Sequence, residues 1–147
     1  MHEKTFITIA EALQGDIGPL SRKVLQYSMT YKQVTDAAKG SKITPADWAP
    51  LAQLVAVDEF ERVGAQKEVM DWATYTAFVS EYANSATWDG SFRRITEVPG
   101  LVFLELEERG GGHDGSHSYK VNTITVYEFN DAGKLKHLDV YIQGPAR

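Results

Sequence analysis

Large apolar residues recur at helical spacing in two stretches of the first half of the chain. One stripe runs from Leu20 to Val34 and the other from Val69 to Ala83, with neighbouring members three or four residues apart. Residues spaced in this way lie on one face of a helix. We therefore predict one helix that begins near Leu20 and ends near Gly40, and another over the second stretch, whose buried face is rich in aromatic side chains.

A helix-start signal and a short alternating segment lie between these two helices. The sequence Thr44-Pro45-Ala46-Asp47 combines a hydroxyl cap, a proline at the first helical position and a carboxylate three residues after the cap. It predicts a short helix that continues to Leu54. Residues 57–64 then alternate in character, which indicates a short strand with Phe60 and Arg62 on one side.

After Asn84 the apolar period changes from helical to alternating. Turn sequences at Pro99-Gly100 and residues 130–133 divide this half of the chain, and the glycine-rich residues 110–118 are predicted to form a flexible connection. Four strands are predicted, over residues 91–98, 101–109, 119–129 and 135–143. Helices followed by an antiparallel meander predict an α+β fold in which helices cover one face of a curved sheet.

Composition narrows the classes of function. The 147 residues are 43% hydrophobic and 24% charged, which is typical of one globular domain over residues 1–147. The net charge of −5 argues against nucleic acid as a partner, because phosphate binding needs a basic face. Cysteine is absent, which excludes thiolate chemistry and fits a reducing compartment. No apolar run approaches the roughly 20 residues of a membrane span, so we expect a soluble cytoplasmic protein with no membrane partner.

The order of the predicted elements resembles that of the nuclear transport factor 2-like superfamily. This superfamily includes ketosteroid isomerases, limonene epoxide hydrolases, scytalone dehydratase and SnoaL-like polyketide cyclases. The most telling segments are residues 54–64, which lead into the aromatic helix, and the hairpin of residues 126–135, which is followed by Leu138-Asp139-Val140-Tyr141. The resemblance extends over roughly residues 20–143.

The resemblance implies a cone-shaped, half-open barrel. A curved antiparallel sheet would wrap around the N-terminal helices and leave a deep, mostly apolar pocket for a hydrophobic small molecule. The resemblance also implies a homodimer through the outer sheet face, where Ile124 or Thr125, Val140 and Ile142 would meet their copies.

Aromatic residues with polar tips suit the walls of such a pocket. The candidates for substrate binding are Tyr27, Tyr31, Phe60, Trp72, Tyr75 and Trp88, together with His137 and Tyr141 of the last strand. The alternative is that the aromatic residues at helical spacing only pack the core.

Asp139 is the first candidate for a catalytic residue. Strand alternation places His137, Asp139 and Tyr141 on one face and the apolar residues between them on the other. A carboxylate in a partly dry cavity suits general acid–base work. By the resemblance, Asp139 matches the catalytic carboxylate that limonene epoxide hydrolases and SnoaL-like cyclases carry in this strand. The opposite parity would turn Asp139 to solvent and the apolar residues inward.

Arg62 and Glu108 are the other catalytic candidates. By the resemblance, Arg62 stands where ketosteroid isomerases carry their general base, but a guanidinium takes no proton near neutral pH and would instead orient an acid or stabilise an oxyanion. Glu108 matches the second aspartate of the epoxide hydrolases, and Leu106 replaces their bridging arginine. Arg62 could rebuild the bridge between Glu108 and Asp139. The alternatives are a surface arginine paired with a neighbouring glutamate and a solvated, charged strand end.

These observations favour a small-molecule enzyme. We expect a polyketide-, terpenoid- or steroid-like substrate and cofactor-free acid–base catalysis of the cyclase, epoxide hydrolase or isomerase type. The loop residues His113 and His117 have no rigidly placed third ligand in the sequence, so no metal site is expected. The competing classes are a non-catalytic ligand-binding or dimerisation module and a protein-interaction adaptor, because fold does not determine function.

Overall fold

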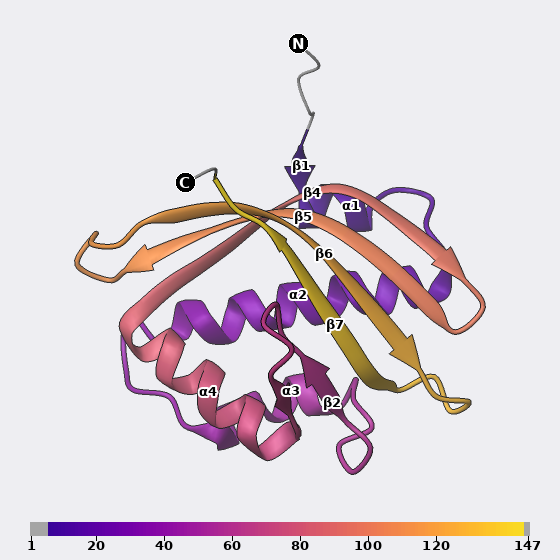
Figure 1. The fold of residues 1–147 in the computed structure, drawn as a ribbon, viewed down its shortest axis with the longest axis horizontal. Helices are drawn as coiled ribbons and strands as arrows, with labels where there is room; N and C mark the ends of the chain where they lie inside the picture. The colour runs from indigo at the N-terminus through magenta and orange to yellow at the C-terminus, as the bar shows by residue number, and fades with distance from the viewer. Residues whose placement is uncertain (1–5, 146–147) are drawn as a thin grey trace.

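The computed structural model describes residues 6–145, in which a curved sheet lies over the helices (Figure 1). The seven strands are β1 (Ile7–Thr8), β2 (Glu61–Val63), β3 (Val69–Met70), β4 (Ala86–Val98), β5 (Leu101–Gly112), β6 (Tyr119–Phe129) and β7 (Leu135–Gln143). Their order in the sheet is β1-β4-β5-β6-β7-β2-β3, and only β2 and β7 pair in parallel. The predicted α+β class and the unclosed, curved sheet are confirmed.

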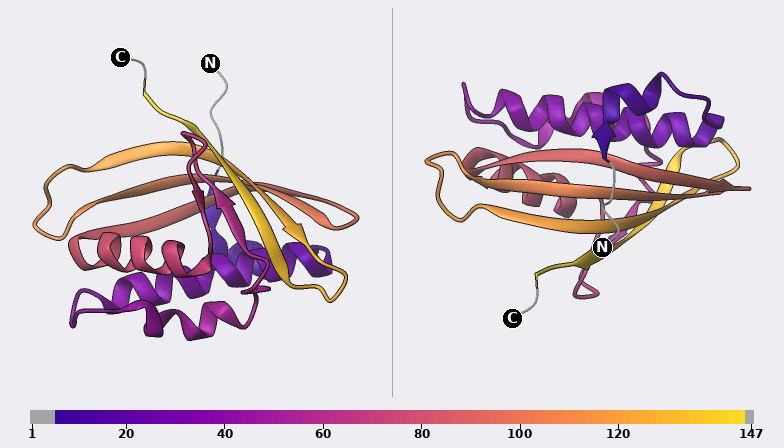
Figure 2. Two further views of the ribbon diagram at one scale, coloured as in Figure 1. Left: turned by 60° about the horizontal axis from the view of Figure 1, so that its bottom comes forward. Right: turned by 90° about the horizontal axis from the view of Figure 1, so that it is seen from above.

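The helices lie on the concave side of this sheet, as the two further views show (Figure 2). They are α1 (Ile9–Leu13), α2 (Pro19–Ala37), the 3₁₀ helix η1 (Pro45–Trp48), α3 (Ala49–Ala52) and α4 (Trp72–Ser85). No helix within residues 6–145 has both the length and the apolar character that crossing a bilayer requires.

Helix α2 begins at Pro19, close to the predicted start, and its N-terminus is capped from the sheet. Glu97 Oε1 on β4 accepts hydrogen bonds from the backbone N–H (2.6 Å) and the hydroxyl (2.8 Å) of Ser21. Gly18 precedes the helix and leaves space for this carboxylate, because a Cβ there would lie 2.5 Å from Glu97 Oε1. One of the free N–H groups at the start of the helix is thus satisfied by a distant strand, which ties α2 to β4.

Helix α4 begins three residues later than the apolar spacing predicts. The carboxylate of Asp71 accepts a hydrogen bond of 2.8 Å from Thr74 N–H and caps the helix, so Trp72 is the first helical residue. Val69 and Met70 instead form β3, which pairs with β2. The apolar stripe therefore runs through the end of one hairpin into the helix, and periodicity alone did not separate the two.

The central strands are longer than predicted. Strand β4 starts at Ala86 directly after α4, and β5 continues through Gly110, Gly111 and Gly112. The prediction that the whole glycine-rich segment is a flexible connection is wrong for these three residues. At Gly110 a side chain has no space, since a Cβ would collide with the carbonyl oxygen of Thr87. Glycine here permits close backbone approach within a strand.

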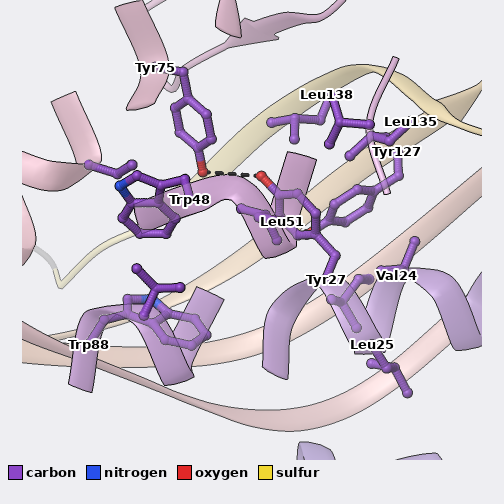
Figure 3. Packing of buried hydrophobic residues seen from close by; sticks show 14 of the residues in the cluster. Val24, Leu25, Tyr27, Trp48, Leu51, Tyr75, Trp88, Tyr127, Leu135 and Leu138 are labelled. Carbon is purple, nitrogen blue, oxygen red and sulfur yellow. Dashed lines mark hydrogen bonds between the residues drawn. The ribbon is translucent and has the colours of Figure 1, made fainter. Parts of the chain in front are cut away.

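The hydrophobic core fills the space between the sheet and the helices, including α3 and α4 (Figure 3). Trp48 and Leu51, Leu25, and the strand residues Leu104 and Leu135 have almost no exposed surface. The indole Nε1 of Trp48 donates a hydrogen bond of 2.8 Å to Ser80 Oγ, which satisfies its one polar atom. This packing fixes α2 and α4 against the sheet and leaves a cavity beside them.

Candidate functional site

The candidate site is a cavity of about 410 Å³ between the concave face of the sheet and helices α2 and α4. Six of its lining residues are tyrosines: Tyr27, Tyr31, Tyr75, Tyr82, Tyr119 and Tyr127. Arg62 and Glu108 are the charged residues among those that line it. The cavity opens beside Phe78, Tyr119 and Ile142, which are 45%, 36% and 51% exposed.

A wider groove of about 610 Å³ lies at the surface beside Lys32, Asp89 and Arg109. Its central charges neutralise one another, because Arg109 Nη2 lies 2.7 Å from Asp89 Oδ2 and Lys32 Nζ lies 3.0 Å from Asp36 Oδ2. Exposed ion pairs of this kind are common on protein surfaces and indicate no ligand. We therefore take the tyrosine-lined cavity as the candidate site.

Strand β7 presents its apolar face to the cavity. Leu138, Val140 and Ile142 line it, and they pair in register with Tyr127, Thr125 and Thr123 of β6, which also line it. The prediction that Asp139 faces the cavity is wrong, as is the same prediction for His137 and Tyr141. Alternation fixes which residues share a face, and the face with more apolar surface is the one that folding buries.

On the outer face, Asp139 belongs to a small polar cluster. Its Oδ1 lies 3.1 Å from Nε2 of His137, whose Nδ1 lies 3.2 Å from Oε1 of Glu61 on β2. The cluster links β2 and β7 where they pair in parallel. Tyr141, 61% exposed, is also on this face. Asp139 therefore cannot reach a molecule bound in the cavity without a change of strand register.

Arg62 lies on β2 with its side chain towards the cavity and is only 16% exposed. Its guanidinium carbon lies 5.6 Å from the ring centre of Tyr75 and 5.9 Å from that of Phe78. The nearest acid is Glu68, whose Oε1 is 3.6 Å from Arg62 Nη1. Among the described residues no acceptor lies within hydrogen-bond distance of the buried Nη1. The site thus contains a cation held between aromatic rings and incompletely paired.

Glu108 lies at the other end of the cavity. Arg62 on β2 pairs with Leu138, which pairs with Tyr127, which in turn pairs with Val102 on β5. Glu108 is six residues after Val102 on the same strand, about 20 Å away along an extended backbone. The hypothesis that Arg62 bridges Glu108 and Asp139 is therefore wrong. The two charged groups are separated. Burial raises the pKa of Tyr75, and the two groups act on that pKa oppositely, since Arg62 lowers it and Glu108 raises it.

Trp88 holds the carboxylate of Glu108. The indole Nε1 donates a hydrogen bond of 2.6 Å to Glu108 Oε1. Gly90 is paired with Glu108 across β4 and β5, and the indole lies over it, because a Cβ at Gly90 would be 3.1 Å from the Trp88 ring. A glycine two residues after Trp88 on the same strand face thus gives the indole room to reach Glu108.

The cavity tyrosines are neutral hydrogen-bonding groups. Burial raises the pKa of Tyr27, Tyr31, Tyr75 and Tyr127, and burial together with neighbouring charges does the same for Tyr82 and Tyr119. The hydroxyl of Tyr27 donates to that of Tyr75 at 3.3 Å, so the two phenols meet from α2 and α4 (Figure 3). Their O–H groups can donate to carbonyl or ether oxygens of a ligand.

The other aromatic candidates divide into lining and packing residues. Tyr27, Tyr31 and Trp88 line the cavity as predicted. Phe60 and Trp72 do not line it: the Phe60 ring stacks on Tyr75 with centroids 5.5 Å apart, and the Trp72 ring meets Phe60 at 5.1 Å. These two support the cavity wall from behind, which corresponds to the alternative of core packing.

Sequence reasoning missed the contribution of β6. Tyr119, Val121, Thr123, Thr125 and Tyr127 all line the cavity and stand at alternate positions of one strand. The sequence contains the pattern that identifies them, because side chains at every second position of a strand lie on the same face. The buried hydroxyl of Thr123 has no hydrogen-bond partner among the described residues.

The fold has counterparts among solved structures. A candidate SnoaL-like polyketide cyclase from Shewanella putrefaciens CN-32 aligns with a TM-score of 0.66 at 11% identity, over 97% of this chain and 92% of that one. A nuclear transport factor 2-like protein of unknown function from Cytophaga hutchinsonii aligns with a TM-score of 0.61 at 11% identity, over 88% and 94%. An LEH-like epoxide hydrolase from M. tuberculosis aligns with a TM-score of 0.56 at 10% identity, over 78% and 84%.

No family model matches the sequence, and no curated protein matches it. At identities this low, structural similarity describes the fold and leaves the chemistry open. The resemblance found in the sequence is confirmed at that level: the chain has the fold of the nuclear transport factor 2-like superfamily.

Proposed function

We propose that the cavity binds a small molecule with a largely apolar body and transforms it by cofactor-free acid–base catalysis. The observation that carries this proposal is the presence of one carboxylate, Glu108, and one guanidinium, Arg62, in a cavity whose other polar groups are neutral phenols and hydroxyls. The fold neighbours described as cyclases and as an epoxide hydrolase support a reaction of that class.

Glu108 is the group that moves the proton. Its Oε1 is occupied by the Trp88 N–H, and Oε2 has no hydrogen bond within residues 6–145, so Oε2 is free to take a proton from substrate or from an attacking water. The Trp88 hydrogen bond fixes the carboxylate in the orientation required for that transfer. A base held in place in this way avoids the loss of conformational freedom that a mobile side chain would suffer.

The remaining groups stabilise charge on the substrate. Tyr75 lines the same cavity beside Arg62, and its phenol, whose pKa is raised by burial, donates to an oxygen on which negative charge develops. Arg62 supplies the positive charge at the far end. Because Tyr75 is buried and the Arg62 side chain is 16% exposed, their interactions with a bound molecule are less screened than they would be in solution.

The proposal is tested by a reaction that needs only a base. The protein is incubated in deuterium oxide with an aromatic 1,3-diketone, and exchange of the acidic C–H is followed by NMR; hydrolysis of a terpenoid epoxide is measured in parallel. Glu108→Gln should lower the rate by about 100-fold or more. Glu107→Gln is the matched control, since Glu107 is its neighbour on the outer face and pairs with Lys120.

Two results would contradict the proposal. One is equal rates for the wild-type protein and Glu108→Gln. The other is ligand binding without turnover in the wild-type protein, which would favour the alternative of a non-catalytic ligand-binding module of the same fold.

A further inference from the structure

The guanidinium of Arg62 has more hydrogen-bonding capacity than the protein uses. Among the described residues no hydrogen bond is formed by any of its five N–H donors, and Nη1 is shielded from solvent. An arginine that is 16% exposed usually has a close acid or carbonyl partner, because burial of an unpaired charge is unfavourable. Arg62 therefore has no hydrogen-bonded acceptor among the described residues.

Glu68 supplies only part of the missing negative charge. It lies on the hairpin between β2 and β3, is 44% exposed, and stays 3.6 Å from Arg62 Nη1. Its second oxygen accepts the N–H of Gln66 at 3.0 Å, so the carboxylate is held by its own hairpin. This contact partly balances the charge of Arg62. It leaves free the two parallel N–H donors of the guanidinium, which can bind a carboxylate in a bidentate manner.

The rest of the cavity indicates the shape of the missing partner. The rings of Tyr75 and Phe78 flank the guanidinium, and Trp88 and Tyr31 meet at the Glu108 end with their rings edge to face, 5.0 Å between centroids. Walls built from ring faces and edges suit a flat aromatic body. The buried Thr123 hydroxyl, which also lacks a protein partner, lies along the same cavity.

We infer that the natural ligand is an aromatic carboxylate whose acidic group binds Arg62 and whose ring system extends towards Glu108. The inference rests on the proposed function for the identity of the site and adds the chemical class of the substrate. A carboxylate matches the two parallel N–H donors of a guanidinium, and no other cation lines this cavity within the described residues. An acid bound in this direction keeps its charge away from the carboxylate of Glu108, which would otherwise repel it.

The test compares two probes of equal shape, 2-naphthoic acid and its neutral amide, by isothermal titration calorimetry near neutral pH. The acid should bind about 10- to 100-fold more tightly than the amide, the range expected for a charge-assisted hydrogen bond. Arg62→Leu should abolish the difference between the probes, and Arg62→Lys should restore part of it. Arg94→Leu is the matched control, because Arg94 lies on the outer face and pairs with Glu105.

A second variant tests the part played by Glu68. Glu68→Gln removes the competing charge beside Arg62 and should tighten acid binding by about two- to fivefold, with no change for the amide. If Arg62 only stabilised the fold and did not contact the ligand, Glu68→Gln would not tighten the binding of the acid. Circular dichroism and thermal unfolding verify that each variant folds.

The inference is overturned if the amide binds as tightly as the acid, if the preference survives in Arg62→Leu, or if neither naphthalene binds. Failure of the proposed catalysis is a separate result. In that case Glu108→Gln would retain full exchange activity while the preference for the acid, and its dependence on Arg62, remained.

Discussion

The indole nitrogen of Trp88 and the carboxylate of Glu108 are joined by a hydrogen bond of 2.6 Å across β4 and β5. Trp88→Phe removes the donor and keeps most of the ring. We expect turnover to fall by about tenfold, because the carboxylate loses its fixed orientation, while the free energy of unfolding falls by about 1 kcal/mol. Steady-state kinetics and denaturant unfolding measure the two effects.

Trp48→Phe is the control for this prediction. Trp48 also donates its Nε1–H to a side chain, Ser80 Oγ at 2.8 Å, but lies in the core away from the lining residues. It should lose stability without losing rate per folded molecule. Equal rate losses in the two variants would show that the indole of Trp88 matters only for packing.

The raised pKa values of the cavity tyrosines predict stability at alkaline pH. Burial raises the pKa of six of the seven tyrosines in the folded state above the ordinary value of 10.0. The neutral phenols therefore contribute stability that is complete below about pH 10 and is lost as pH rises towards their folded-state pKa values, because the unfolded chain releases these protons first.

Spectrophotometric titration checks this behaviour. Phenolate absorbance of the native protein should lag behind that of the protein in denaturant, and the missing absorbance should appear together with unfolding. Coincident titration curves for native and denatured protein would contradict the burial of the tyrosines.

Alternation in the sequence predicted which residues share a face and left open which face is inside. In β7 both assignments gave a consistent strand, and the resemblance favoured Asp139 inward. The structure buries Leu138, 3% exposed, on the cavity side and leaves Asp139 outside. The decision depends on the neighbouring strands, because Tyr127 and Thr125 of β6 lie opposite Leu138 and Val140, and no pattern within one strand contains that information.

Glu108 shows what the resemblance could contribute. The resemblance alone singled out its position on β5, with a solvated strand end as the alternative, and the residue does line the cavity. Its hydrogen-bond partner, Trp88, was not predicted. The indole reaches Glu108 because Gly90, which pairs with Glu108 across the two strands, has no side chain. Which residue lies opposite a glycine depends on the register of the two strands. The sequence does not specify that register uniquely, so a contact of this kind cannot be predicted from it.

Asp139→Asn follows from this correction. With the carboxylate on the outer face, the substitution should leave turnover within about twofold of the wild-type rate. It removes one of the two acids beside His137, so a small loss of stability is expected, typical of a partly exposed pair. A loss of activity comparable with that of Glu108→Gln would show that β7 adopts the other parity when substrate is bound.

Gly110→Ala tests the close packing at the rim of the cavity. A Cβ at this position would collide with the Thr87 carbonyl and lie 2.7 Å from the Tyr82 hydroxyl and 2.8 Å from that of Tyr119. These two hydroxyls are 2.5 Å apart, and Tyr82 donates to Thr87 O. We expect destabilisation by about 1–3 kcal/mol and weaker ligand binding. Gly144→Ala, where a Cβ meets nothing, should be neutral in both measurements.

The outer face of the sheet carries exposed apolar residues of the kind that the predicted homodimer requires. Most of them are not the residues expected from the sequence. Thr125, Val140 and Ile142 face the cavity, whereas Ile124 and Tyr141 are paired in register on the outside and are 41% and 61% exposed. Phe103, 37% exposed, lies on the same face of β5. Burial of this patch against a second copy would remove apolar surface from water.

We expect light scattering after gel filtration to give the mass of a dimer for the wild-type chain. A charge at the centre of the patch would have to be desolvated in the dimer, so Ile124→Glu should give a folded monomer whose unfolding midpoint, unlike that of the wild-type chain, does not depend on protein concentration. Val98→Glu is the control, because Val98 is 42% exposed but lies at the hairpin end of β4. A monomeric wild-type chain, or an Ile124→Glu variant that remains dimeric, would exclude an interface through this patch.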